Sequence, residues 1–275
     1  MKKLTISFYL GLSLFVVLIL FVYATRLFYD TSLVDIGSKM PYLPPSSNEL
    51  LGSDSFGRDM LASILIGTPL TFQVGILGGS IGLFIGATLG LISGYFGGKI
   101  DTFIRIISDS LVTIPSIAIL LVAALNIENL TRLSLAVIVA GLSWMYPART
   151  IRAQVLSLKN RDFIKICRAN GQGEVDILFR DVMPNLMPYL ASTYVLSVFT
   201  TMIATVGLES LGLGVEGDYS LGTILYWSQR KAAVVTGTWW WYAPPILMLT
   251  LIFLALLLMS VGLDKVARPS DSAKV

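Results

Sequence analysis

The sequence predicts an all-α membrane protein with six transmembrane helices and with both termini on the cytoplasmic side. Of its 275 residues, 55% are hydrophobic and only 13% are charged, and the mean hydropathy is +0.76. These values are typical of integral membrane proteins and not of soluble domains. Six stretches stay apolar over roughly the 20 residues that a helix needs to cross the hydrocarbon core. The distribution of basic residues then gives the orientation.

The predicted spans follow one another along the chain, separated by polar loops. They lie at residues 5–26, 72–95, 106–126, 133–151, 189–213 and 242–263. The first span has an alternative interpretation as a signal peptide, with Val22-Tyr23-Ala24 as a weak cleavage site. Its apolar run is longer than the roughly 7 to 15 residues of a signal peptide, so we expect a retained anchor. With the N-terminus inside, fourteen of the 20 Lys and Arg residues fall on the cytoplasmic side.

Three regions follow from these spans. Residues 1–71 hold the first helix and an extracytoplasmic loop with an amphipathic segment, residues 72–270 form a core of five spans with a cytoplasmic loop at 153–188, and residues 271–275 are a cytoplasmic tail. The amphipathic segment is LGSDSFGRDMLASILIG, where Ser53 or Asp54 can cap a short helix and Asp54 can pair with Arg58. We expect a structural element at the membrane surface, with contact to a substrate as the alternative.

The second span carries a strict four-residue glycine repeat. Residues four apart share one face of a helix, and glycine on that face lets another backbone approach closely. The repeat comprises Gly78, Gly82, Gly86, Gly90 and Gly94. We expect it to pack inside its own subunit, with a dimer seam as the alternative. Among the few charges in the spans, Asp109 is expected to pair with Arg105 one turn earlier, and Glu209 lies near the outer end of the fifth span.

Composition excludes several classes of function. The chain has no histidine and a single cysteine, Cys167, so it lacks the ligands for a zinc or haem site and the base for a Ser-His or Cys-His pair. It contains no phosphate-binding G-x-x-x-x-G-K-[ST] loop, and its net charge of +3 is scattered, which argues against nucleic acid. Because charges near the middle of the membrane are scarce, an ion-coupled secondary carrier is disfavoured. We therefore expect no catalytic, cofactor or metal site.

The loop DFIKICRANGQGEVDILFRDVMPNLMP, residues 162–188, is strongly polar between two apolar spans. Its apolar residues recur with helical spacing, and Asn170-Gly171 is a typical helix stop. Pro184 and Pro188 lead the chain into the fifth span. Two short helices joined by a glycine turn are therefore expected at the cytoplasmic face. Periodicity alone leaves open whether lipid headgroups or the groove of a cytoplasmic partner receive this hairpin.

The same loop resembles the "EAA" signature of ABC importer permeases. In that signature a Glu-Ala-Ala triplet precedes a glycine, and a proline follows the glycine at thirteen residues. Here the triplet position holds Lys165-Ile166-Cys167, the glycine is Gly171 and the proline is Pro184. The spacing matches, whereas lysine replaces the usual glutamate.

A second stretch, LGSDSFGRDMLASILIGTPLTF, is similar to the outer-loop motif of C-type permeases from dipeptide, oligopeptide and nickel importers. The matching motif residues are Gly52, Asp54, Gly57, Arg58 and Asp59. Pro69 stands where that group often has arginine. ARTIRAQVLSLKNRDFI and GLESLGLGV also resemble the group, so the resemblance covers most of residues 50–270.

The resemblance implies a type I ABC importer permease fold and a non-enzymatic transport subunit of the cell membrane. It implies as partners a second, B-type permease, one or two cytoplasmic ATPases that bind ATP and Mg, and an extracytoplasmic solute-binding protein. Di- or oligopeptides are the expected solute, and nickel, metal chelates and oligosaccharides are the alternatives. The residues expected to couple the permease to the ATPases are Phe163, Ile164, Lys165, Ile166, Cys167, Arg168, Gly171 and Pro184.

Overall fold

The computed structural model describes residues 5–267, which contain helices and no strand. The predicted tail at 271–275 lies outside the described residues. In chain order the helices are α1 Ile6–Phe28, η1 Thr31–Val34, α2 Met60–Phe96, α3 Gly98–Thr113, α4 Ser116–Leu125, α5 Arg132–Ser143, α6 Met145–Lys159, α7 Asp162–Ala169, α8 Glu174–Asp176, the π-helical η2 Ile177–Val182, α9 Met183–Ser210, α10 Leu221–Arg230 and α11 Trp239–Ala267.

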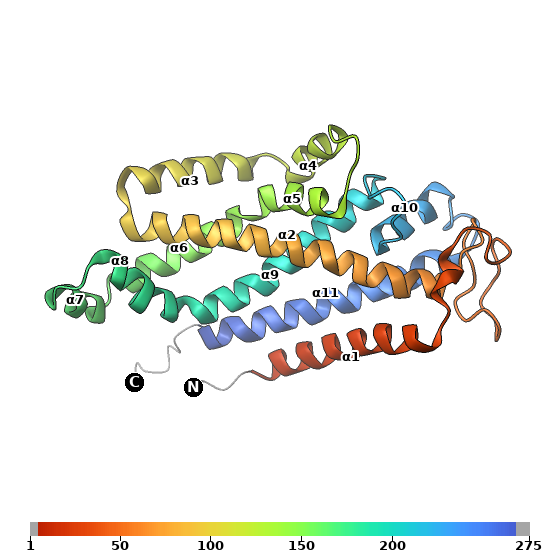
Figure 1. The fold of residues 1–275 in the computed structure, drawn as a ribbon, viewed down its shortest axis with the longest axis horizontal. Helices are drawn as coiled ribbons and strands as arrows, with labels where there is room; N and C mark the ends of the chain where they lie inside the picture. Colours follow the sequence, from red (N-terminus) through yellow and green to blue (C-terminus); the bar gives the residue numbers. More distant parts are fainter. Residues whose placement is uncertain (1–4, 268–275) are drawn as a thin grey trace.

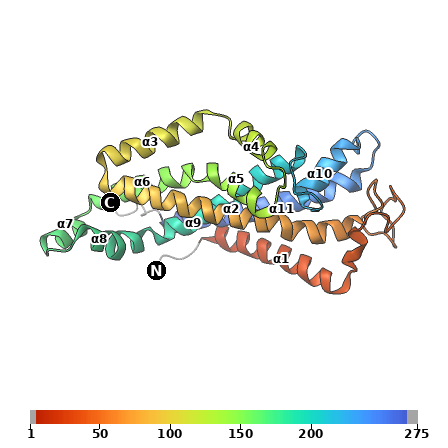
Figure 2. The same cartoon turned by 45° about the horizontal axis from the view of Figure 1, so that its top comes forward.

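The long helices α1, α2, α9 and α11 run along the length of the molecule (Figure 1). The hairpin of α7 and α8 projects at one end, whereas α10 and the loop between α1 and α2 lie at the other. The start of α1 and the end of α11 both lie toward the end that carries the hairpin. Figure 2 shows α3 and α4 as an arch on one side of the bundle. The polar segments of the sequence are thus sorted to opposite ends of an apolar bundle.

Four described segments are long and apolar enough to cross a membrane: α1, α2, the run Glu174–Ser210 and α11. A fifth is the pair α3 and α4, which passes the same test only as a unit bent by 86°. The predicted span at 106–126 is therefore broken. The break lies at Ile114-Pro115, where the proline ring drives Ile114 out of the helical region to φ −88° and ψ 133°.

The predicted span at 133–151 is likewise divided. Helix α5 has 12 residues, too few to cross a bilayer, and α6 begins again at Met145. Pro147 lies in the first turn of α6, where its missing N–H interrupts the helical hydrogen bonds between α5 and α6. The count of six spans stays a prediction.

Two further expectations differ from the structure. The predicted short helix around residues 54–65 does not exist separately, because α2 begins at Met60 and continues unbroken for 37 residues, across the boundary predicted at residues 71 and 72. Asp109 forms its ion pair with Arg149 of α6 and not with Arg105. The arginine of another helix is closer to this carboxylate than the arginine one turn earlier in α3.

The glycine repeat packs inside the subunit, as expected. A Cβ atom added at Gly86 would lie 2.5 Å from the carbonyl oxygen of Trp144, and one at Gly90 would lie 2.6 Å from that of Ala148. At Gly78 the nearest atom belongs to Thr201 of α9, at 2.7 Å. The backbone of α2 is therefore in contact with α6 and α9 at distances that only glycine allows.

The first helix joins the bundle through the same kind of contact. At Gly11 of α1 an added Cβ would lie 2.7 Å from the carbonyl oxygen of Ala255, and at Gly262 of α11 it would lie 2.6 Å from the backbone of Phe8. Two glycines on facing helices thus let α1 lie directly on α11.

We predict that Gly86→Ala destabilises the protein by about 1 to 3 kcal/mol, because the new methyl group meets backbone atoms that cannot move without shifting α6. The measurement is the temperature at which the purified protein loses its monodisperse elution peak.

The matched control for this change is Gly141→Ala in α5, where an added Cβ has no atom within 4 Å. It is expected to leave the transition unchanged. Equal transition temperatures for the two variants would contradict the close packing of α2 on α6.

Candidate functional site

The hairpin between α6 and α9 forms as two short helices separated by a glycine turn. Helix α7 ends at Ala169, and Gly171 adopts the left-handed region with φ +78°. Its N–H donates to the Arg168 carbonyl at 3.0 Å, and the N–H of Gln172 donates to the Cys167 carbonyl at 3.2 Å. These bonds satisfy the last carbonyls of α7, as is usual where a glycine ends a helix. The predicted stop at Asn170-Gly171 is therefore confirmed.

One face of the hairpin is anchored in the bundle. Ile164 and Val182 are fully buried and Leu178 nearly so. They belong to a core cluster that includes Tyr95 at the end of α2 and Ile151 of α6. The hairpin therefore shares a core with the helices it connects and is held as part of the bundle, because burying its apolar side chains contributes to its stability.

Polar contacts fix the turn to α2. The Arg168 guanidinium holds the Glu174 carboxylate across the turn, with Nε to Oε1 at 2.8 Å and Nη2 to Oε2 at 3.1 Å. The Tyr95 hydroxyl donates to the same carboxylate, and Lys159 donates to the Tyr95 carbonyl. The Glu174 carboxylate thus links both arms of the hairpin to the end of α2.

Three apolar side chains of the hairpin are exposed. Ile166 is 60% exposed, Val175 61% and Phe179 58%. Lys165 lies beside Ile166 in α7, and its ammonium group is 2.7 Å from the Asp162 carboxylate. The hydrogen bond between these two groups lowers the pKa of the Asp162 carboxyl. We name Ile166, Val175 and Phe179 the hairpin patch. Large exposed apolar side chains on an otherwise charged loop are typical of a contact surface.

The eight residues predicted to couple the permease to the ATPases differ in their exposure in the structure. Lys165, Ile166, Arg168 and Gly171 are exposed on the hairpin, and Pro184 is exposed in the first turn of α9. Phe163 and Cys167 are half-buried against the core, and Ile164 is fully buried, so its side chain is not exposed to a partner. Val175 and Phe179 are exposed but were not among the predicted coupling residues. Their spacing of four residues, which is typical of one helix face, could have identified them.

The outer-loop motif forms a rigid turn in front of α2. Gly52 and Gly57 have positive φ angles of 66° and 71°. The Asp54 carboxylate accepts hydrogen bonds from the N–H groups of Phe56 and Arg58, at 2.7 and 2.9 Å. Burial raises the pKa of the Asp54 carboxyl against the effect of these bonds. Asp54 therefore shapes the turn and does not cap a helix.

The remaining two motif residues connect this turn to the bundle. Asp59 is the N-cap of α2, accepting from the Ala62 N–H at 2.8 Å and from the Tyr29 hydroxyl at 2.9 Å. The Arg58 guanidinium lies 3.9 Å from the Asp54 carboxylate and stacks over the rings of Phe56 and Tyr219, 4.8 and 4.3 Å from their centroids. The contacts of the motif are thus internal to the described chain, and the helix cap is Asp59, where Ser53 or Asp54 was predicted.

Seven polar positions of the spans could either line a pathway or form hydrogen bonds at helix contacts. They are Ser108, Thr113, Ser116, Thr200, Thr201, Thr205 and Ser210. Thr113, Thr200 and Ser210 donate to carbonyls of their own helix, at 2.7 to 3.0 Å. Thr201 is fully buried and approaches the Ser143 hydroxyl at 3.4 Å. Most of this polar set thus satisfies bonds within or between helices.

The comparisons with known proteins agree with this arrangement. A family model described as "Binding-protein-dependent transport system inner membrane component" matches residues 86–270. The oligopeptide transport system permease protein OppC of Lactococcus lactis subsp. lactis (strain IL1403) is 34% identical over 217 residues, which cover 76% of this chain and 72% of that protein.

Two further relatives show the same pattern. OppC of Mycobacterium tuberculosis (strain ATCC 25618 / H37Rv) is 33% identical over 217 residues, which cover 78% of this chain and 75% of that protein. The glutathione transport system permease protein GsiD of Pectobacterium atrosepticum is 35% identical over 172 residues, which cover 62% and 57%. The family match includes the hairpin, the glycine face of α2 from Gly86 onward and the helices that hold them. The chain belongs to the family of inner membrane components of binding-protein-dependent transport systems.

Proposed function

We propose that this chain is the C-type permease subunit of an ATP-driven importer for di- or oligopeptides. The observation that carries the proposal is the hairpin patch, an exposed apolar surface on a hairpin that is itself anchored in the bundle. A cytoplasmic ATPase with an apolar groove is a suitable occupant of this patch. The peptide cargo is supported by the relatives, which are named as oligopeptide, glutathione and dipeptide permeases.

The proposed complex has further members. A second, B-type permease completes the pathway, one or two ATPases bind ATP and Mg on the cytoplasmic side, and an extracytoplasmic binding protein delivers the solute. In this arrangement the chain has six spans in the cell membrane, and the hairpin and both termini face the cytoplasm. The excess of basic residues at the hairpin end supports this orientation.

Coupling in this proposal is mechanical. ATP closes the ATPase pair and carries the hairpins of the two permeases toward each other. Because Ile164 and Leu178 are buried against α2 and α6, the hairpin cannot slide without moving those helices. Interfaces packed in this way switch between discrete arrangements and do not deform continuously. The cavity turns outward when ATP binds, and hydrolysis reverses the change.

We predict that Val175→Asp lowers the amount of ATPase that stays with the tagged permease by about tenfold, because a carboxylate would have to be buried in an apolar groove. The measurement is the ratio of ATPase to permease after affinity purification from membranes.

Val234→Asp is the matched control for the hairpin patch. Val234 is 69% exposed in the loop that follows α10. Figure 1 shows α10 at the end of the molecule opposite to the hairpin. This variant is expected to retain the ATPase. Undiminished retention by Val175→Asp would remove the hairpin patch as the docking surface.

We predict that Gly171→Val separates ATP hydrolysis from uptake. A β-branched residue at φ +78° is strained by roughly 1 to 2 kcal/mol and shifts the turn, although no atom lies within 4 Å of the added Cβ. The measurement is the number of solute molecules imported per ATP hydrolysed, which should fall.

Gly171→Asn controls for this change, since asparagine tolerates the left-handed region. Its ratio of uptake to hydrolysis should stay near that of the unchanged protein. Normal uptake by Gly171→Val would contradict the coupling role of the turn.

A further inference from the structure

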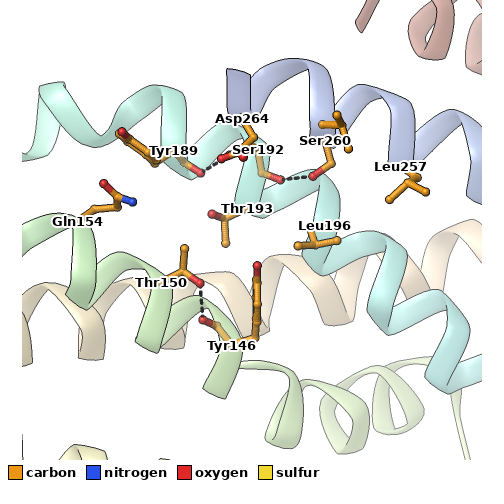
Figure 3. Close-up of a pocket in the computed structure, with 11 residues that line it drawn as sticks. Tyr146, Thr150, Gln154, Tyr189, Ser192, Thr193, Leu196, Leu257, Ser260 and Asp264 are labelled. Atoms are coloured by element: carbon orange, nitrogen blue, oxygen red, sulfur yellow. Dashed lines mark hydrogen bonds between the residues drawn. The ribbon is translucent and has the colours of Figure 1, made fainter. Parts of the chain in front are cut away.

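Two cavities in the half of the bundle nearer to the hairpin differ in charge. The larger, of about 590 Å³, lies between α6, α9 and α11, and hydroxyl groups from all three helices line it (Figure 3). The smaller, of about 230 Å³, lies between α2, α3 and α6, and its lining includes Arg105, Arg149 and Arg152. We name this smaller cavity the arginine pocket. Because drug-sized ligands occupy roughly 300 to 1,000 Å³, a cavity of this volume suits one compact group.

The arginine pocket lies near the end of the apolar bundle. Ser93 in its wall is within one turn of Phe96, where α2 ends. Figure 1 shows this end of α2 together with α3 and α6 near the hairpin. The ends of the spans are the level at which a membrane protein meets the phosphate groups of lipids.

The charges of the arginine pocket are not balanced within the described chain. Arg152 binds the Asp101 carboxylate through two hydrogen bonds, of which the one from Nη2 to Oδ2 measures 2.6 Å, and Arg149 donates to Asp109. The guanidinium of Arg105 is exposed, and it forms no hydrogen bond or ion pair with any residue that the structure describes. The Asp101 carboxylate acts on Arg105 only through space. Three guanidinium groups thus face two carboxylates, which leaves one positive charge in excess.

The arginines also keep donors for a further partner. A guanidinium carries five N–H donors. Arg149 uses its Nη2 on Asp109, and its side chain is 46% exposed, so the remaining donors are accessible. Planar donors of this kind bind phosphate oxygens in pairs. The pocket therefore suits an anionic phosphate group.

The helix that carries Arg105 has an exposed apolar face. Ile100, Phe103 and Ile107 recur at helical spacing, and they are 50%, 66% and 37% exposed. Arg105 and Ser108, which line the pocket, belong to a different face of the same helix. A ligand with both a phosphate and hydrocarbon chains can contact both faces of α3, whereas a soluble phosphate compound can contact only one.

We propose that the arginine pocket binds the headgroup phosphate of an anionic phospholipid, whose acyl chains lie along α3. Basic pockets between membrane helices are typical sites for such headgroups. The phosphate bridges Arg105 of α3 and Arg149 of α6, and so adds a connection between these helices to the existing pair of Arg149 and Asp109. Phosphatidylcholine has the same phosphate, but its choline cancels the charge, so the pocket prefers the anionic lipid. Binding of this lipid does not depend on which solute is transported.

The test is native mass spectrometry of the purified full-length protein, with the subunits that copurify, after addition of phosphatidylglycerol or phosphatidylcholine with identical acyl chains. The unchanged protein should bind phosphatidylglycerol about tenfold more tightly, because charge-assisted hydrogen bonds form only with an uncompensated phosphate. Arg105→Gln should bring the two dissociation constants to within about twofold of each other. Arg105→Lys, which keeps the charge but not the planar donors, should give an intermediate preference.

Arg161→Gln is the matched control, because Arg161 is an exposed arginine before α7 and lies outside the pocket. This variant should keep the full preference. Equal binding of the two lipids by the unchanged protein, or a preference that survives Arg105→Gln, would overturn the site. The temperature at which each variant loses its monodisperse elution peak shows that it is folded.

A photoreactive phosphatidylglycerol with a diazirine in its acyl chain locates the lipid on the unchanged protein. Its adducts should map to the α3 peptide that contains Phe103 and Ile107, and excess phosphatidylglycerol should reduce them more than excess phosphatidylcholine. Inorganic phosphate and glycerol phosphate should not reduce them. Adducts confined to other helices would overturn the site, and competition by the soluble phosphates would overturn a lipid as its ligand.

Discussion

Direct backbone contact between helices is the interaction on which the rest of this structure depends. Lipid provides no hydrophobic drive for helices to associate, so close packing has to supply the attraction. The glycines of α2 allow its backbone to touch α6 along the stretch from Gly86 to Gly94, and Gly78 brings it to α9. Helix α2 thereby holds the middle of the bundle, and its two ends carry the outer-loop motif and the tyrosine that fixes the hairpin.

This packing connects the hairpin to the cavity between α6, α9 and α11. Ile151 and Val155 of α6 lie in the core cluster that buries the hairpin, while Thr150 of the same helix lines the cavity. On α9, Leu186 belongs to that cluster and Thr193 faces the cavity. A displacement of the hairpin therefore reaches the cavity walls through two continuous helices. In the importer that we propose, the separation of α6 from α9 would be the variable through which ATPase closure changes access to the solute.

The four long apolar helices, the glycine face and the hairpin could be predicted from sequence, because each depends on local spacing. The break at Pro115 and the division at Trp144 could not be located by hydropathy, which averages over a window longer than either break. The partner of Asp109 depends on where α6 lies relative to α3, and local spacing suggested the wrong arginine.

Some features of the candidate sites could likewise be predicted from sequence, and others could not. Gly171 and its turn follow from a helix stop that can be read in the chain, whereas the inward face of Ile164 depends on the angle at which α7 meets the bundle. The cavity between α6, α9 and α11 was missed entirely. Thr193 and Asp264 lie on separate helices, and only the packing of α9 and α11 brings them to one cavity.

In the function that we propose, uptake through this chain is driven by ATP in a complex with ATPase subunits. The most direct test incorporates the purified complex into liposomes and follows a labelled dipeptide. We predict uptake that requires ATP and the binding protein and that persists when ion gradients are collapsed. Uptake by the chain alone, without ATP and driven by an ion gradient, would contradict it.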